Sequence, residues 1–132
     1  MNNLLTATLI LAYLFLATAC TKEQPEGDHA ADITFRTDSS FTWRNDTVPL
    51  SDTLHIGINV SKGSDDIRSF FVDVAYDNGP RLRQDSVHVD SDPFTFVKTV
   101  ITRDQASTET WWFSVREYDG DITQRALTLT AQ

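Results

Sequence analysis

Histidine and cysteine are common catalytic and metal-binding residues, and this chain holds few of either. It has three histidines, His29, His55 and His88, and one cysteine, Cys20. Nucleophilic catalysis needs a nucleophile beside a base, and the sequence holds no Gly-x-Ser-x-Gly elbow. His-x-His and His-x-x-x-His spacings, which would favour a metal site, are also missing from the sequence. We therefore predict a non-enzymatic protein that needs no cofactor.

Aspartates form the second pattern with chemical meaning, because they recur in pairs at predicted turns. Carboxylates gathered in turns supply the oxygen ligands of calcium sites, and the same residues also cap ordinary turns. We expect turn formation to be their main role. The calcium candidates are Asp65, Asp66, Asp119 and Asp121. A calcium-stabilised module is accordingly one alternative function.

Aromatic residues are the remaining candidates for ligand binding. If Trp111 and Phe113 face the core, the alternation of side chains along a strand places Trp112 on the outside, and Trp43 can lie outside as well. Exposed rings stack on sugars or protein partners. The alternative is that adjacent tryptophans fill the core and its rim. Trp43 and Trp112 are thus candidate stacking residues of a glycan-binding module, the second alternative function.

The composition excludes one class of partner. The 132 residues hold 19 acidic and 11 basic side chains, which gives a formal net charge of -8. Nucleic-acid binding depends on clustered Lys and Arg that release counterions, so we expect no nucleic-acid partner. A single cysteine cannot form an intramolecular disulfide, and apolar burial must therefore hold the domain together.

The first residues are typical of an export signal. No charged side chain occurs from Met1 to Thr21, and residues 4–19 are almost entirely apolar. A membrane-spanning helix requires roughly 20 apolar residues, whereas the core of a signal peptide requires about 7 to 15 before small residues at the cleavage site. We interpret residues 1–19 as a helical signal peptide; the alternatives are an uncleaved anchor helix and an ordinary secretory signal cut before an incidental free cysteine.

The sequence LATAC at residues 16–20 resembles the lipobox of Bacteroidota-type bacterial lipoproteins. This resemblance implies that cleavage leaves Cys20 at the mature amino terminus, where it receives lipid. Each buried methylene contributes about 0.8 kcal/mol, so several acyl chains anchor a protein stably to a membrane. The resemblance implies a location in the bacterial cell envelope, and we expect the outer membrane. It does not distinguish the periplasmic face of that membrane from the cell surface.

The polar stretch after Cys20 lacks apolar periodicity and contains Pro25 and Gly27. Such a composition cannot bury enough surface to fold, and we interpret residues 20–31 as a flexible tether. Three Asp-Ser/Thr-apolar tripeptides further along resemble the O-glycosylation acceptors of Bacteroidota-type exported proteins. Their hydroxyl residues are Thr47, Thr53 and Ser86. In the alternative reading, each Asp ends a turn and the next residue begins a strand.

Residues 32–132 show the alternation of an all-β domain. Residues 54–60 place Leu, Ile, Ile and Val on one face, and residues 70–76 and 111–115 repeat the pattern with aromatic residues. Turn signals separate these runs. Asn78-Gly79 tolerates positive φ, and Asp119-Gly120 between two apolar runs predicts a hairpin. A weaker strand is expected within residues 41–50.

Seven to eight strands in one domain of this size predict an immunoglobulin-like antiparallel sandwich. The last hairpin resembles that of bacterial immunoglobulin-like or cadherin-like modules. We therefore expect a non-enzymatic, lipid-anchored cell-envelope protein that acts as an adhesion, assembly or scaffold module. Its expected partners are the membrane, through lipid on Cys20, and a protein or glycan of unknown identity.

Overall fold

The computed structural model describes residues 27–132, and every regular element in this range is a strand. The eight strands are β1 (Asp32–Phe35), β2 (Asp46–Val48), β3 (Thr53–Ser61), β4 (Ile67–Tyr76), β5 (Leu82–His88), β6 (Phe94–Ile101), β7 (Ser107–Glu117) and β8 (Ile122–Ala131). Residues 27–132 include no helix that is long and apolar enough to cross a membrane. The predicted signal segment and Cys20 lie outside the described residues.

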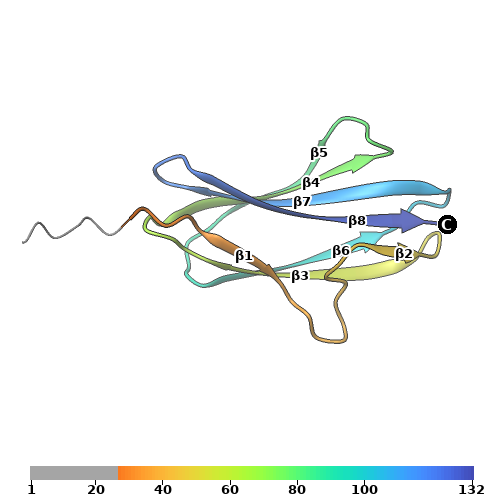
Figure 1. The fold of residues 1–132 in the computed structure, drawn as a ribbon, viewed down its shortest axis with the longest axis horizontal. Helices are drawn as coiled ribbons and strands as arrows, with labels where there is room; N and C mark the ends of the chain where they lie inside the picture. The colour runs from red at the N-terminus through yellow and green to blue at the C-terminus, as the bar shows by residue number, and fades with distance from the viewer. Residues whose placement is uncertain (1–26) are drawn as a thin grey trace, which may run out of the picture.

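The strands form two sheets that lie face to face (Figure 1). The three-stranded sheet has the order β1-β3-β6, and the five-stranded sheet has the order β2-β8-β7-β4-β5. All neighbours are antiparallel except β2, which runs parallel to β8. The polar segment between β6 and β7 carries the chain from one sheet to the other. The all-β, two-sheet prediction is confirmed.

Apolar side chains from both sheets fill the space between them. The faces predicted for residues 54–60, 70–76 and 111–115 are the buried ones, with Ile56, Phe70 and Phe113 fully buried. The Phe113 ring on β7 meets that of Phe35 on β1 edge-on, with centroids 5.7 Å apart. Phe70 and Phe96 make a second contact between the sheets, at 5.0 Å. Aromatic packing across the layers therefore lies at the centre of the core.

The predicted turns form, with one shift in register. Asp119-Gly120 joins β7 to β8, and Gly120 has a φ of 106°. Between β4 and β5, positive φ falls on Asp77 and Asn78, one residue earlier than the Asn78-Gly79 pair suggests. The Gly79 amide donates to the Tyr76 carbonyl at 2.8 Å, which closes a two-residue turn with left-handed central residues. This geometry suits the twist of a tight hairpin.

The weak strand expected within residues 41–50 is much shorter, because only Asp46–Val48 pairs. Residues 36–42 instead lie along the edge of β3 that β1 occupies. The Arg36 amide donates to the Gly57 carbonyl, and the Thr42 amide donates to the His55 carbonyl, each at 2.8 Å. A Cβ on Gly57 would lie 2.8 Å from Arg36 Cδ, so glycine leaves the space that the Arg36 side chain fills.

The chain contacts the sandwich from His29 onward, three residues before the predicted start of the domain. His29 donates its amide to Ser64 Oγ and accepts from the Ser64 amide, at 2.8 and 2.7 Å. Ala31 is buried, and its amide donates to Oε2 of buried Glu117 at 3.1 Å. The end of the segment interpreted as tether is therefore bound to the domain.

Candidate functional site

Trp43 lies in an open groove of about 330 Å³ at the seam between the two sheets. The groove is lined by Ile33, Thr34, Phe35, Thr37, Trp43, Arg125 and Ala126. Trp43 is 42% exposed, and the Arg44 guanidinium carbon lies 5.4 Å from the centre of its ring. The indole therefore presents apolar surface to solvent beside hydroxyl and guanidinium groups.

Two features of the sequence place Trp43 there. Thr42 is held at the edge of β3 by its bond to His55, Asn45 accepts from the Thr128 amide on β8 at 2.8 Å, and Trp43 lies between these two contacts. Arg125 on β8 donates from Nε to the Ile33 carbonyl on β1 at 3.2 Å, which links the edges of the two sheets. An aromatic surface flanked by hydrogen-bonding groups matches the needs of a sugar ring, which is apolar on its faces and polar at its rim.

Trp112 occupies a different surface, the outer face of the five-stranded sheet. Trp111 and Phe113, the residues before and after it, are buried, as the predicted alternation requires. The Arg81 guanidinium carbon lies 3.8 Å from the centre of the Trp112 ring and covers it. Trp43 and Trp112 thus do not form one platform, and Trp43 has the more accessible ring.

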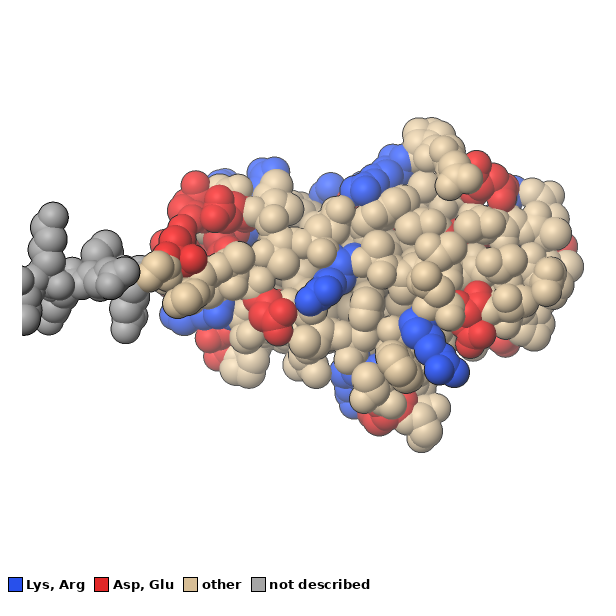
Figure 2. Space-filling view, in the orientation of Figure 1, with Lys and Arg blue, Asp and Glu red and all other residues tan. Residues whose placement is uncertain are grey.

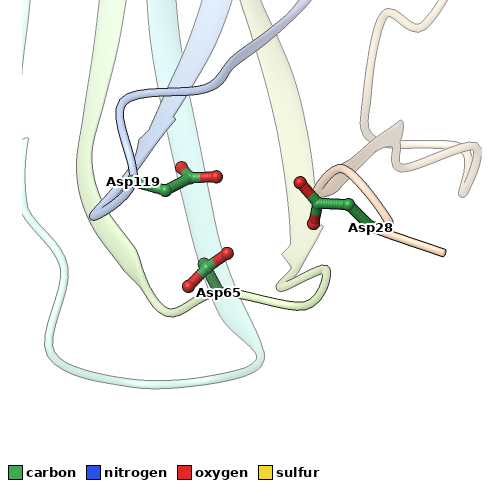
Figure 3. A group of neighbouring side chains, drawn as sticks. All are labelled: Asp28, Asp65 and Asp119. Carbon is green, nitrogen blue, oxygen red and sulfur yellow. The ribbon is translucent and has the colours of Figure 1, made fainter. Parts of the chain in front are cut away.

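A carboxylate cluster lies at the end of the sandwich that the amino-terminal segment joins (Figure 3). It joins Asp28 from the amino-terminal segment, Asp65 from the β3–β4 turn and Asp119 from the β7–β8 turn. One oxygen from each lies within 4.8 Å of the others. Figure 2 shows acidic side chains gathered at this end, next to the grey residues. Asp65 and Asp119 were both calcium candidates from the sequence, whereas Asp28 had been assigned to the tether.

Crowding changes the titration of Asp65. Desolvation raises the pKa of Asp65 above its usual 3.8, and the charges of Asp119 and Asp28 raise it further. The other two calcium candidates have separate contacts. Asp66 accepts a hydrogen bond from Lys62 Nζ at 2.8 Å, and the Asp121 amide donates to Asp119 Oδ1 at 3.0 Å. Three carboxylates match the ligands of a hard cation. Exposed acidic groups are also common without a bound cation.

The candidate glycosylation residues Thr47, Thr53 and Ser86 are all exposed. Their preceding aspartates also have local roles. Asp46 and Asp52 accept hydrogen bonds from the Thr47 and Thr53 amides, at 2.8 and 2.9 Å. Both interpretations of these tripeptides, turn formation and modification, are therefore compatible with the geometry.

His55 and His88 lie on exposed strand positions. His55 Nδ1 is 3.2 Å from Thr99 Oγ1, and His88 Nε2 is 2.9 Å from Asp90 Oδ1. Neither histidine belongs to a group of three potential metal ligands in the described part of the chain. These contacts fit the solvated surface role that the strand alternation predicts.

An arrangement of arginines and aromatic rings on the outer face of the five-stranded sheet was not predicted. We call it the arginine–aromatic face, and its residues are Phe71, Arg81, Arg83, Trp112 and Arg116. The guanidinium carbons of Arg83 and Arg116 lie 4.2 and 5.9 Å from the centre of the Phe71 ring. Alternation alone indicates that Phe71 and Trp112 point outward, but only the pairing of β4 with β5 and β7 brings the arginines to them.

No protein-family model matches the sequence, and no curated protein is significantly similar to it.

Proposed function

We propose that this protein is a non-enzymatic, lipid-anchored component of the bacterial cell envelope whose β-sandwich acts as an adhesion, assembly or scaffold module. Lipid on Cys20 would hold the protein in the outer membrane. The sandwich would then present its two outer faces and the Trp43 groove to partners.

The strand order supports an immunoglobulin-like identity for the sandwich. A three-stranded sheet faces a five-stranded one, and the last two strands form a central hairpin of the larger sheet. Two packed antiparallel sheets of short strands are typical of immunoglobulin-like modules, which bind partners through exposed faces and loops. The observation that carries the binding role is the arginine–aromatic face, because a large solvated array of this kind contributes little to the core.

Fractionation of cells tests the anchoring part of the proposal. Wild-type protein recovered from the membrane fraction should carry labelled fatty acid and require detergent for release, whereas Cys20→Ala should carry no label in any fraction. His29→Ala, a substitution in the same amino-terminal region, is the matched control and should be labelled like the wild type. Equal fatty-acid labelling of wild type and Cys20→Ala would contradict lipid anchoring at Cys20.

The Trp43 groove favours glycan binding as a second candidate function. Its support is a half-exposed indole beside Thr34, Thr37 and Arg125 in one groove. On a glycan array, Trp43→Ala should abolish a reproducible signal that Trp112→Ala retains, because Arg81 already covers the Trp112 ring. Absence of any signal for the wild type, or equal loss in both variants, would remove this candidate.

A further inference from the structure

The arginine–aromatic face has a charge opposite to that of the protein as a whole. The chain carries a net charge of -8, yet this face joins three arginines to one aspartate, Asp73. Arg81 stacks on Trp112, and Arg83 stacks on Phe71. Lys and Arg side chains also lie along the upper edge of Figure 2, on the side of the five-stranded sheet. The face is therefore a positive patch on an acidic molecule.

Stacking fixes the arginines in a useful orientation. A guanidinium that lies on an aromatic ring is held by cation–π attraction, while the N–H groups at its rim still donate in their own plane. Those donors match a carboxylate in a two-point contact. Because the rings hold the guanidinium groups in place, binding an anion here costs less side-chain entropy than binding it with free arginines.

Two of the three arginines have donors available. Arg83 donates to Asp73, which is only 8% exposed, and this pair fixes Arg83 beside Phe71. Arg81 makes one long hydrogen bond, 3.4 Å, to the Gln124 side chain. Arg116 is exposed and forms no ion pair with any residue in the range 27–132. Arg83 is thus fixed within the face, and the guanidinium groups of Arg81 and Arg116 are accessible to a partner.

We propose that the arginine–aromatic face binds the acidic surface of a partner protein through Asp and Glu carboxylates. The charge of the face selects an anionic partner. Arginine with Trp and Phe is the composition of protein-interface centres, from which Lys, Glu and Asp are depleted. A neutral glycan fits less well, because Arg81 and Arg83 cover the ring faces on which a sugar would stack. This inference rests on the proposed binding role and names its partner class.

Binding of a labelled poly-glutamate peptide to the full chain in nonionic detergent tests the proposal. Fluorescence anisotropy at low salt should show binding that weakens as salt is added. Arg81→Gln and Arg116→Gln should each weaken it by about two- to fivefold, the range for exposed ion pairs. Arg36→Gln is the matched control, since it removes an arginine that lies over another aromatic ring, Phe41, outside the face, and its affinity should equal that of the wild type.

Three results would overturn the proposal: no binding of poly-glutamate at low salt, equal loss in Arg36→Gln, or tighter binding of heparin or of phosphatidylglycerol vesicles than of the peptide. The last result would instead indicate a sulfated glycan or a membrane surface. None of these results depends on whether Cys20 carries lipid, which fractionation measures separately. Failure of this inference is therefore distinguishable from failure of the anchoring proposal.

Discussion

Replacing Phe113 by alanine tests the two-layer core most severely. Phe113 lies at the middle of β7 and is fully buried. Its ring meets Phe35 across the sheets at 5.7 Å and Phe70 within its own sheet at 6.4 Å. The substitution removes one of the largest buried side chains and takes away an aromatic contact from both Phe35 and Phe70.

The expected loss follows from this burial. Truncation of a buried Phe to Ala costs about 3–5 kcal/mol, because both the transfer free energy and the packing around the cavity are lost. A single domain is typically stable by about 5–15 kcal/mol. Phe113→Ala should therefore remove a large part of the free energy of unfolding and lower the melting temperature by more than about 12 °C.

Urea unfolding followed by tryptophan fluorescence measures this loss, since Trp111 is buried two residues away. Ile101→Ala is the control. Its side chain is 69% exposed on edge strand β6, so the change in unfolding free energy should stay within about 0.5 kcal/mol. A loss below about 1 kcal/mol for Phe113→Ala, or equal losses for the two variants, would refute the packing of the sheets described above.

Two further predictions concern the end of the sandwich near the tether. The folded-state pKa of Asp65 is raised, so its ionised form is disfavoured by folding and stability is lost as pH rises through that pKa. Asp65→Asn should therefore have a higher urea midpoint than wild type at neutral pH. The difference should vanish below about pH 3.8, the usual pKa of the aspartate. A lower midpoint for Asp65→Asn at neutral pH would contradict the crowding of carboxylates. A Cβ on Gly63 would lie 1.7 Å from the His29 carbonyl oxygen. Gly63→Ala should release His29 from Ser64 and lower the free energy of unfolding by about 2 kcal/mol, because two hydrogen bonds are lost. Amide exchange at Ser64 should then become faster. Unchanged exchange would show that the amino-terminal segment is not bound there.

The fold was largely predictable because strand alternation is a local signal. Ile56, Ile58 and Val60 occupy every second position, and one face of a strand must be buried. The strand expected within residues 41–50 is present but only three residues long, because the preceding Thr42 instead bonds to the edge of β3 at His55, a long-range contact. Propensity describes neither this edge contact nor the parallel pairing of β2 with β8.

Buried polar groups were the least predictable feature. Glu109 and Glu117 occupy inward positions at the two ends of β7, where alternation predicts apolar residues. Each is accommodated by a backbone donor from another segment, Arg103 for Glu109 and Ala31 for Glu117, at 2.9 and 3.1 Å. Those donors come from loops whose paths the sequence does not specify.

The candidate surfaces were predictable only in part. The outward direction of Trp112 followed from alternation, and the location of Asp65 and Asp119 in turns followed from the pairing of aspartates at turn signals. Arg81, by contrast, precedes β5 and reaches Trp112 on β7 across the intervening strand β4. Such a contact between distant positions requires the order of strands in the sheet, which no local pattern supplies.

The proposal of a lipid-anchored envelope module is tested most directly by the intact mass of the protein extracted from the membrane fraction. The account predicts that wild-type protein begins at Cys20 and carries the added mass of acyl chains on that residue. It predicts that Cys20→Ala lacks this addition. A wild-type chain that begins elsewhere, or that begins at Cys20 without acyl groups, would contradict the account.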